Sequence, residues 1–232
     1  MPLLTLAPAV TQSPLFGLSV TVGFYAIALM IRGRCRWAHP ILLTCAGTLL
    51  AIWAFGAEIK AYRTGGDLIT MALGPATVAL AVPLYKHAER IRAALRPVLA
   101  GVLVGSLTGV ASGAAFVLVV GGSSQIMLSM MPKSVTTPIS MEISRLIGGW
   151  PELTAAMTVL TGLAGSIGGP MFLRVCGVRH PAAVGVAMGA ATHGIGTARM
   201  LEDDPVQGSF SAVAMGLCGM LTTMLAIPWV MG

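Results

Sequence analysis

The chain has 232 residues, of which 56% are hydrophobic and only 9% are charged. Such a sequence lacks the charged surface that a water-soluble domain needs, which excludes a soluble enzyme and indicates a protein embedded in the lipid bilayer. The formal net charge of +6 does not indicate a nucleic-acid partner, because the basic residues stand in short loops between apolar runs, where they set membrane topology.

Most of the sequence consists of long runs that contain no Asp, Glu, Lys or Arg. Several of these runs reach the roughly 20 residues that cross a bilayer as a helix. We therefore predict an all-α, polytopic membrane protein of about seven to eight spans, forming a single transmembrane domain over residues 1–232. The uncharged runs cover residues 1–31, 37–57, 68–85, 97–132, 153–173, 180–198 and 205–232.

Lysine and arginine are concentrated in the loops at residues 32–39, 86–96 and 174–181. By the positive-inside rule, these loops belong in the cytoplasm. We therefore expect the N-terminus outside and the C-terminus in the cytoplasm.

Residues 97–173 lie between two of these loops and must cross the membrane an even number of times. The runs that begin at Pro97 and Leu153 supply two crossings. Segment 121–152 must then enter and leave on the same side, and it is too short for two more spans of about 20 residues. We predict a re-entrant hairpin there, buried in protein.

Two of the expected spans contain helix-breaking residues near their middle. The first contains Gly74, Pro75 and Pro83, and the second contains Gly194 and Gly196. Paired interruptions of this kind indicate a transporter site near the bilayer midplane. The alternative is that these residues only kink the spans, since proline and glycine are common in membrane helices.

Each interrupted span is followed by a charged loop and then by a glycine-rich span. This order predicts an inverted repeat with halves at residues 40–120 and 153–231, linked by the re-entrant segment 121–152. The span after Pro97 also has a glycine stripe at four-residue spacing, which lets another helix or subunit approach closely. The stripe consists of Gly101, Gly105, Gly109 and Gly113.

The first candidate site is the segment from Pro132 to Pro138. Thr137 can cap a helix whose first residue is Pro138, and the free amides at that helix end attract an anion such as a carboxylate. Alternatively, the threonines only satisfy backbone groups and the lysine extends to the membrane interface. The candidate binding residues of this segment are Lys133, Ser134, Thr136 and Thr137.

The second candidate site surrounds His193. A histidine inside a span can change protonation near neutral pH, so His193 is a candidate for substrate binding or proton coupling. We expect Thr197, with Thr77 at the other break, to line the site. Arg199 either faces the anion or ends the span in the aqueous loop.

Glu142 is a second candidate for coupling, although a simple pair with Arg145, three residues on, is the favoured interpretation. No H-E-x-x-H, G-x-S-x-G or P-loop pattern is present, so we expect neither an enzyme nor a cofactor or metal.

Four segments around these residues resemble the LrgB/CidB membrane protein family, and the resemblance runs from about Pro14 onward. Ser140 departs from the family pattern, which usually has alanine there. The segments are LGPATVALAVPLY at 73–85, PKSVTTPISMEI at 132–143, Gly148-Gly149 and THGIGTAR at 192–199.

The resemblance implies one of two functions in a bacterial inner (plasma) membrane. Members such as the plant plastid glycolate/glycerate transporter and bacterial pyruvate uptake systems move small carboxylates. Others are described as holin-like or antiholin-like regulators of murein hydrolase export and cell lysis. An LrgA/CidA-like small membrane protein is the implied partner, and a homo-oligomer is compatible with the glycine stripe. We expect a small-carboxylate transporter that works by alternating access, with the regulator as the alternative.

Overall fold

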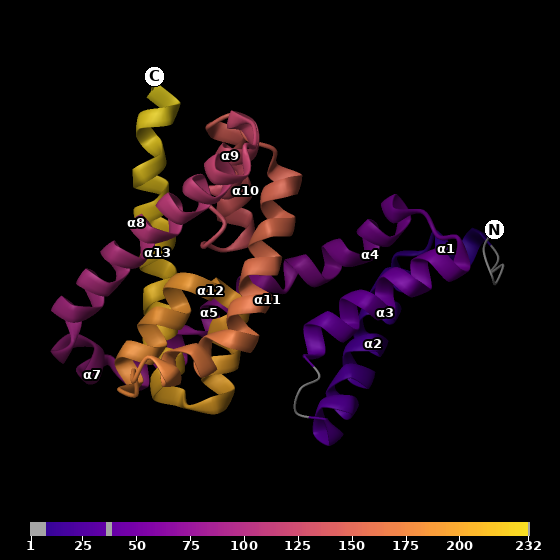
Figure 1. The fold of residues 1–232 in the computed structure, drawn as a ribbon. Coiled ribbons are helices and arrows are strands. Elements are labelled where there is room, and N and C mark those ends of the chain that lie inside the picture. Colours follow the sequence, from indigo (N-terminus) through magenta and orange to yellow (C-terminus); the bar gives the residue numbers. More distant parts are fainter. Residues whose placement is uncertain (1–7, 36–38, 232) are drawn as a thin grey trace. The chain divides into compact units, whose positions relative to one another are not determined.

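The structure is a computed structural model that describes residues 8–35 and 39–231 (Figure 1). Part of the first expected span, at residues 1–7, and part of the basic loop at 32–39, at residues 36–38, lie outside the described residues. All regular elements of the described chain are α-helices, which confirms the all-α prediction. The chain divides into two compact units, with the boundary between Ala79 and Leu80.

The first unit, up to Ala79, packs α2 against α3 and α4. Gly17 of α2 and Gly65 of α4 allow the two backbones to touch, since a Cβ on Gly65 would lie 2.9 Å from the Cα of Gly17. Beside them, the hydroxyls of Thr21 and Tyr62 share a hydrogen bond of 2.7 Å. The helices are α1 (Pro8–Thr11), α2 (Pro14–Arg34), α3 (Pro40–Phe55), α4 (Ile59–Met71) and α5 (Leu73–Ala79).

The second unit, from Leu80 onward, contains three long helices and two helical hairpins. Proline begins several of its helices, because its fixed φ suits the first helical position and its missing N–H is not needed there. The elements are α6 (Ala81–Lys86), α7 (Ala88–Ala93), α8 (Leu95–Val120), α9 (Ser124–Met130), α10 (Thr137–Leu146), α11 (Pro151–Val175), α12 (Pro181–Asp203) and α13 (Pro205–Met231).

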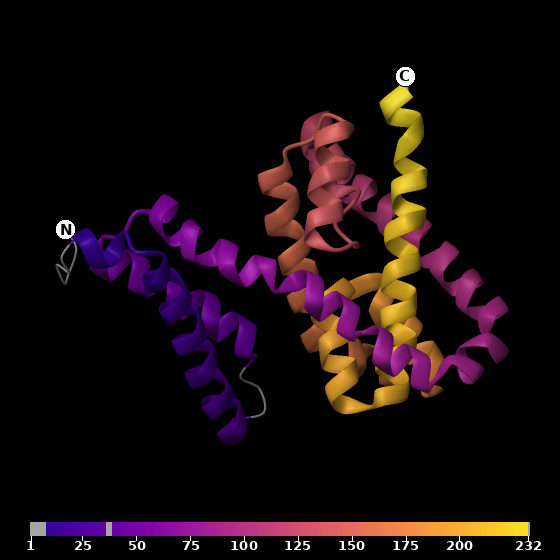
Figure 2. The same cartoon turned by 180° about the vertical axis from the view of Figure 1, so that it is seen from behind.

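The first hairpin consists of α9, the turn at residues 131–136, and α10, which lie side by side in Figures 1 and 2. Its turn reaches α8 well inside that helix, where the Lys133 ammonium donates a 2.8 Å hydrogen bond to the Gly109 carbonyl. Its base is held by α11, since the Thr154 hydroxyl donates to the Ser129 carbonyl at 2.9 Å and the Ser144 hydroxyl at 2.7 Å. We call this element the α9–α10 hairpin.

Helix α12 is itself bent into a hairpin at His193, whose φ of 40° and ψ of −134° are not helical. The half before His193 runs parallel to α13. A Cβ on Gly185 would lie 2.8 Å from the Cβ of Phe210, and a Cβ on Gly189, one turn later, would lie 2.9 Å from the Cα of Ser211.

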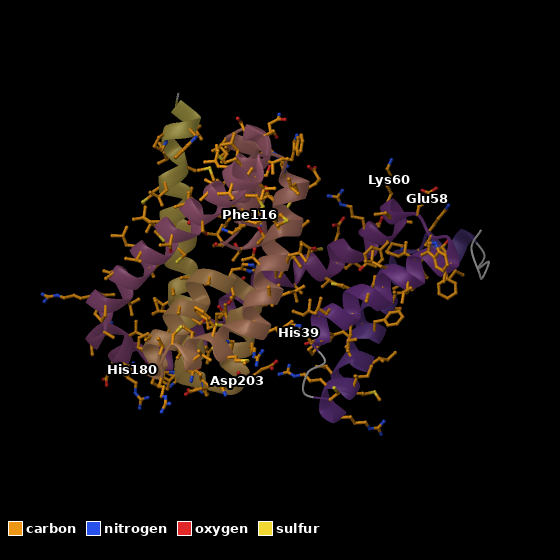
Figure 3. All side chains as sticks on the ribbon, in the orientation of Figure 1. His39, Glu58, Lys60, Phe116, His180 and Asp203 are labelled. Atoms are coloured by element: carbon orange, nitrogen blue, oxygen red, sulfur yellow. The ribbon has the colours of Figure 1, made fainter. Side chains whose placement is uncertain are left out.

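The half of α12 after His193 runs antiparallel to the same helix. Thr197 contacts Ser211 at 2.8 Å, whereas Leu201, one turn later, lies against Gly208, nearer the start of α13. The two halves therefore run in opposite directions, and we call them the α12 hairpin. Figure 3 shows its two ends, marked by His180 and Asp203, at the same end of this unit.

This reversal differs from the expectation that residues 180–198 form one interrupted span. A single residue in the left-handed region is enough to turn the chain, and no sequence signal reports the angle of a break. Both segments that carry the candidate sites are therefore hairpins, and their turns meet the long helices away from the helix ends.

The glycine stripe of α8 receives both hairpins. Its first two glycines face the α12 hairpin, with Val186 and Ala190 each 2.9 Å from where a Cβ would stand. Its last two face the α9–α10 hairpin, through Ser134 and the Met130 carbonyl. The stripe is thus a packing surface within the second unit, where any larger residue would separate α8 from its neighbours.

A buried apolar cluster joins the beginnings of α8, α12 and α13. The loops that precede these three helices therefore lie at one end of the second unit. The cluster contains Val98, Val102, Ala182, Val186, Ala190, Phe210, Ala214 and Cys218.

Within the described residues, five helical segments are long and apolar enough to cross a membrane, which supports a multi-pass membrane protein. A sixth apolar helix, Pro40–Phe55, is shorter. The count of seven to eight spans, the re-entrant placement of 121–152 and the repeat halves 40–120 and 153–231 stay predictions. The five segments are Pro14–Arg34, Ile59–Lys86, Leu95–Val120, Pro151–Val175 and Pro205–Val230.

We predict that Gly113→Ala lowers the free energy of unfolding by about 1–3 kcal/mol, because the new methyl would press on backbone of the α9–α10 hairpin. A Cβ there would lie 2.5 Å from the Met130 carbonyl oxygen. Denaturant unfolding in detergent measures the change. Gly168→Ala is the control, since no atom stands within 4 Å of its Cβ position. Equal stability of the two variants would contradict the stripe as a close contact.

Candidate functional site

A cavity of about 760 Å³ lies in the second unit, between α8, the first half of the α12 hairpin and the turn of the α9–α10 hairpin. Most of its wall is glycine, alanine, valine and proline, and its lining contains no Asp or Glu. The polar side chains in the lining are Thr108, Ser112, Lys133, Ser134, Thr161 and His180.

Lys133 is the one lysine or arginine in this lining. Its ammonium donates to the Gly109 carbonyl at 2.8 Å and to the Ser112 hydroxyl at 3.2 Å, and both partners belong to α8. Neither partner carries a charge, so the positive charge of Lys133 is not neutralised by its hydrogen bonds. An anion that entered the cavity would meet this charge beside several hydroxyl donors.

Ser134 lies next to Lys133 on the turn and also lines the cavity. Thr136 is the N-cap of α10 but makes no side-chain capping bond, and Thr137 is the first helical residue. This differs from the expectation that Thr137 caps a helix beginning at Pro138. Neither threonine is part of the cavity lining.

His193 is buried at the turn of the α12 hairpin, with 3% of its surface exposed. Its Nε2 donates to the Thr158 carbonyl of α11 at 2.9 Å. The ring is outside the cavity lining, which ends two residues earlier at Ala191. In this structure His193 holds the hairpin turn against α11.

Thr158 of α11 bonds the beginning of α10 and the turn of the α12 hairpin. Its hydroxyl donates to the Ser140 hydroxyl of α10 at 3.0 Å, and its carbonyl accepts the bond from His193. Thr158 and Ser140 are fully buried. Ser140, just after the first candidate segment, and His193 therefore both bond one residue of α11.

The other expected site residues lie away from the cavity lining. Thr197 is buried and bonds the His193 carbonyl and the Ser211 hydroxyl, each at 2.8 Å. Arg199 donates to the Ser166 carbonyl of α11 and lies 3.5 Å from the Asp203 carboxylate.

Glu142 pairs with Arg145 at 3.3 Å, and both side chains are more than half exposed. Thr77 belongs to the first unit and donates to the Leu73 carbonyl within its own helix at 2.7 Å. Of the expected site residues, Lys133 and Ser134 are the two that the structure brings into the cavity.

Sequence reasoning missed the α8 and α12 sides of the cavity. Thr108 and Ser112 stand four residues apart, each one position before a glycine of the stripe, so helical spacing could have put them on nearly the same face. The alanines at 182–183, 187 and 190–191 give no such signal, because alanine is as common in packed membrane helices as in cavities. Thr158 was missed because an isolated threonine in an apolar run predicts only a local bond to its own helix.

Comparison with known proteins identifies similar chains along most of the length. The LrgB-like family matches residues 21–232. The protein YxaC of Bacillus subtilis, described as uncharacterized, is 39% identical over 88% of this chain and 89% of its own. The holin-like protein CidB of Staphylococcus aureus is 31% identical over 90% of this chain and 91% of its own.

The antiholin-like protein LrgB of Bacillus mycoides is 29% identical over 94% of this chain and 96% of its own. No solved structure matches. The names of these relatives agree with the holin-like or antiholin-like regulator, the alternative expectation, better than with carboxylate transport, since none of them names a carboxylate.

We predict that Thr158→Val lowers the free energy of unfolding by about 1 kcal/mol, because it removes the bond to Ser140 while keeping the shape and the carbonyl. Thr70→Val is the matched control. The exposed Thr70 hydroxyl bonds only Gly66 of its own helix, so its loss is expected to change stability by less than about 0.5 kcal/mol. Denaturant unfolding of both variants in one detergent measures the difference. Identical free energies of unfolding would contradict a structural role for the Thr158 hydroxyl.

Proposed function

The chain belongs to the LrgB-like family, and on that premise we propose that its second unit carries small monocarboxylates across a bacterial inner membrane. The observation that carries the proposal is the Lys133 ammonium, which faces a cavity whose lining contains no acidic residue. Glycolate, glycerate, pyruvate and lactate are the substrates of this class that we expect.

The cost of burying a lysine supports an anion as its partner. A charge at the centre of a membrane helix costs about 2.5–3.5 kcal/mol on insertion scales, so such residues are seldom without a role. The hydrogen bonds of Lys133 to Gly109 and Ser112 use two of its three N–H groups and leave its charge uncompensated. A carboxylate would compensate the charge, with Ser134 and Ser112 as further donors.

The two hairpins support access from both sides. They begin at opposite ends of the second unit, and the first turn of α10 and the turn of the α12 hairpin both bond Thr158 (Figure 1). Non-helical backbone at membrane depth is tolerated where it is buried in protein or lines a cavity, as at both turns. In this proposal, one hairpin at a time moves away from α11 and opens the site to its own side. Coupling through His193 or Glu142 stays a proposal, since neither lines the cavity.

The α12 hairpin also changes the proposed orientation. The loops before α8, α12 and α13 lie at one end of the unit, and the first two hold most of its basic residues. By the positive-inside rule this end is cytoplasmic. Helix α13 then runs from the cytoplasmic side to the outside, which places the C-terminus outside. The sequence-based expectation placed the C-terminus in the cytoplasm, because it counted residues 180–198 as a membrane crossing.

We predict that alkaline phosphatase fused after Gly232 is active and that green fluorescent protein fused there is dark. Cys176, exposed at the end of α11, serves as an internal reference for the opposite side. In a variant whose Cys35 and Cys45 are serine, an impermeant maleimide should label Cys176 in inside-out vesicles and not in whole cells. A fluorescent C-terminal fusion would contradict the orientation.

For transport, we predict that Lys133→Gln weakens substrate affinity by about tenfold to hundredfold, the range that corresponds to losing a hydrogen bond to a charged group. Isotope counterflow in liposomes measures this, with glycolate, glycerate, pyruvate and lactate at two pH values. Lys60→Gln is the control for lost charge, because Lys60 is exposed in the first unit. Wild-type counterflow from the Lys133 variant would refute the site.

The second candidate function is a holin-like or antiholin-like membrane regulator, which the names of the relatives favour. An LrgA/CidA-like small membrane protein would be its partner. A regulator needs no saturable anion site, so its effect on murein hydrolase activity in the culture fluid should be the same for wild type and Lys133→Gln. That result, together with no counterflow of any C2 or C3 acid, would replace the transport proposal with this one.

A further inference from the structure

The geometry of the cavity points to a more specific ligand class, an inference that rests on the proposed carboxylate site. We infer that the cavity binds monocarboxylates that carry an aliphatic chain, with the carboxylate at Lys133 and the chain lying along α8 toward His180.

The cavity is much larger than a two- or three-carbon acid requires. Its volume of about 760 Å³ falls in the range of roughly 300–1,000 Å³ that holds drug-sized ligands. A liquid water molecule occupies about 30 Å³, and pyruvate is only a few times larger than that. A short acid at Lys133 would therefore leave most of the volume unfilled.

The cavity is also elongated, with its charge near one end. Its α8 wall extends from Pro97 to Ser112, which corresponds to roughly 22 Å at 1.5 Å per helical residue. Lys133 lies at the Ser112 end, through its bond to that side chain. His180, which precedes the α12 hairpin, lies in the lining beside the beginning of α8. The lining therefore forms an open, elongated channel with a cation near one end.

The wall between these ends is mostly hydrocarbon. Apart from Thr108, whose hydroxyl donates to the Val104 carbonyl of its own helix, the α8 and α12 parts of this wall between the two ends are glycines, alanines and valines, whose side chains offer no hydrogen bond. Water in such a space lacks the polar partners that hold ordered water in proteins. An alkyl chain would fill the space and remove apolar surface from water. The wall residues are Val98, Gly101, Val104, Gly105, Ala182, Ala183, Val186, Ala187, Ala190 and Ala191.

A free acid fits this arrangement better than an anionic phospholipid. Lys133 bonds Gly109, which stands about 16 Å along α8 from Val120 at the rise of an α-helix. A phospholipid headgroup stays at the membrane surface and would not reach that depth, whereas the carboxylate of a single-chain acid can travel along the channel.

The test is a homologous series. The full-length protein in detergent binds radiolabelled octanoate, and acetate, butyrate, hexanoate and decanoate compete for the site. Each added methylene is expected to strengthen binding by roughly threefold to fourfold, the factor given by the burial of one CH₂ group. Alkanols of the same lengths control for the apolar term alone and should bind more weakly than the acids. In the Lys133→Gln variant, the acids should bind no more strongly than the alkanols of the same length.

A matched pair of variants distinguishes ligand binding in the channel from partitioning of the ligand into detergent. Ala187→Phe fills the channel wall, whereas Ala198→Phe adds the same side chain on the exposed part of α12 outside the lining. Ala187→Phe should flatten the dependence of affinity on chain length, whereas Ala198→Phe should leave that dependence as in the wild type. Ala183→Phe, one turn away on the same wall, tests the channel again if Ala187→Phe does not fold.

The outcomes distinguish this inference from the function on which it rests. Affinity that stays flat from acetate to decanoate, with Lys133 still required, would overturn the aliphatic ligand and leave short-acid transport standing. Stronger competition by phosphatidylglycerol than by octanoate would also overturn it. No competition by an acid of any length would reject both.

Discussion

Backbone that leaves a helix inside a bilayer must find its hydrogen-bond partners in protein, since lipid offers none. In the second unit, helix α11 bonds both segments that leave helical geometry. The Thr154 hydroxyl bonds the Ser129 carbonyl of one hairpin, and the Thr158 carbonyl accepts from His193 of the other. Because α11 bonds both hairpins, the two broken segments pack against one helix instead of standing as two isolated kinks.

The glycine stripe of α8 provides the second half of the same arrangement. It removes side chains from the helix face on which the hairpins rest, so that the Lys133 side chain can reach a backbone carbonyl. The absence of side chains at the glycine positions of α8 therefore allows both the close packing of the hairpins and the approach of Lys133 to the Gly109 carbonyl. The cavity lies beside the stripe and is lined mainly by small residues of α8 and α12.

The sequence predicted the elements whose signals are local. Proline and glycine marked the turn near Pro132 and the break near His193, and the lack of charges marked the spanning helices. Lys133 was predicted as an anion site because a lysine beside prolines and hydroxyls is unusual in an apolar segment. These features depend on a few neighbouring residues and require no knowledge of tertiary contacts.

The remaining features depend on packing between distant segments. The angle at His193 is fixed by contacts with α11 and α13, so a break was predictable but a reversal was not. The junction at Thr158 requires Ser140, a serine where the resemblance led us to expect alanine. His193 was predicted to face the ligand, yet its ring bonds α11, because the direction of a side chain at a break follows from the fold.

The reversal at His193 also constrains how the chain is inserted during synthesis. Each half of the α12 hairpin is well below the roughly 20 residues that enter a bilayer independently. Both halves pack along α13, which leaves the ribosome after them. A ribosome stalled before Pro205 would therefore leave this segment with its contacts to α8 and α11 but without the helix along which both of its halves pack.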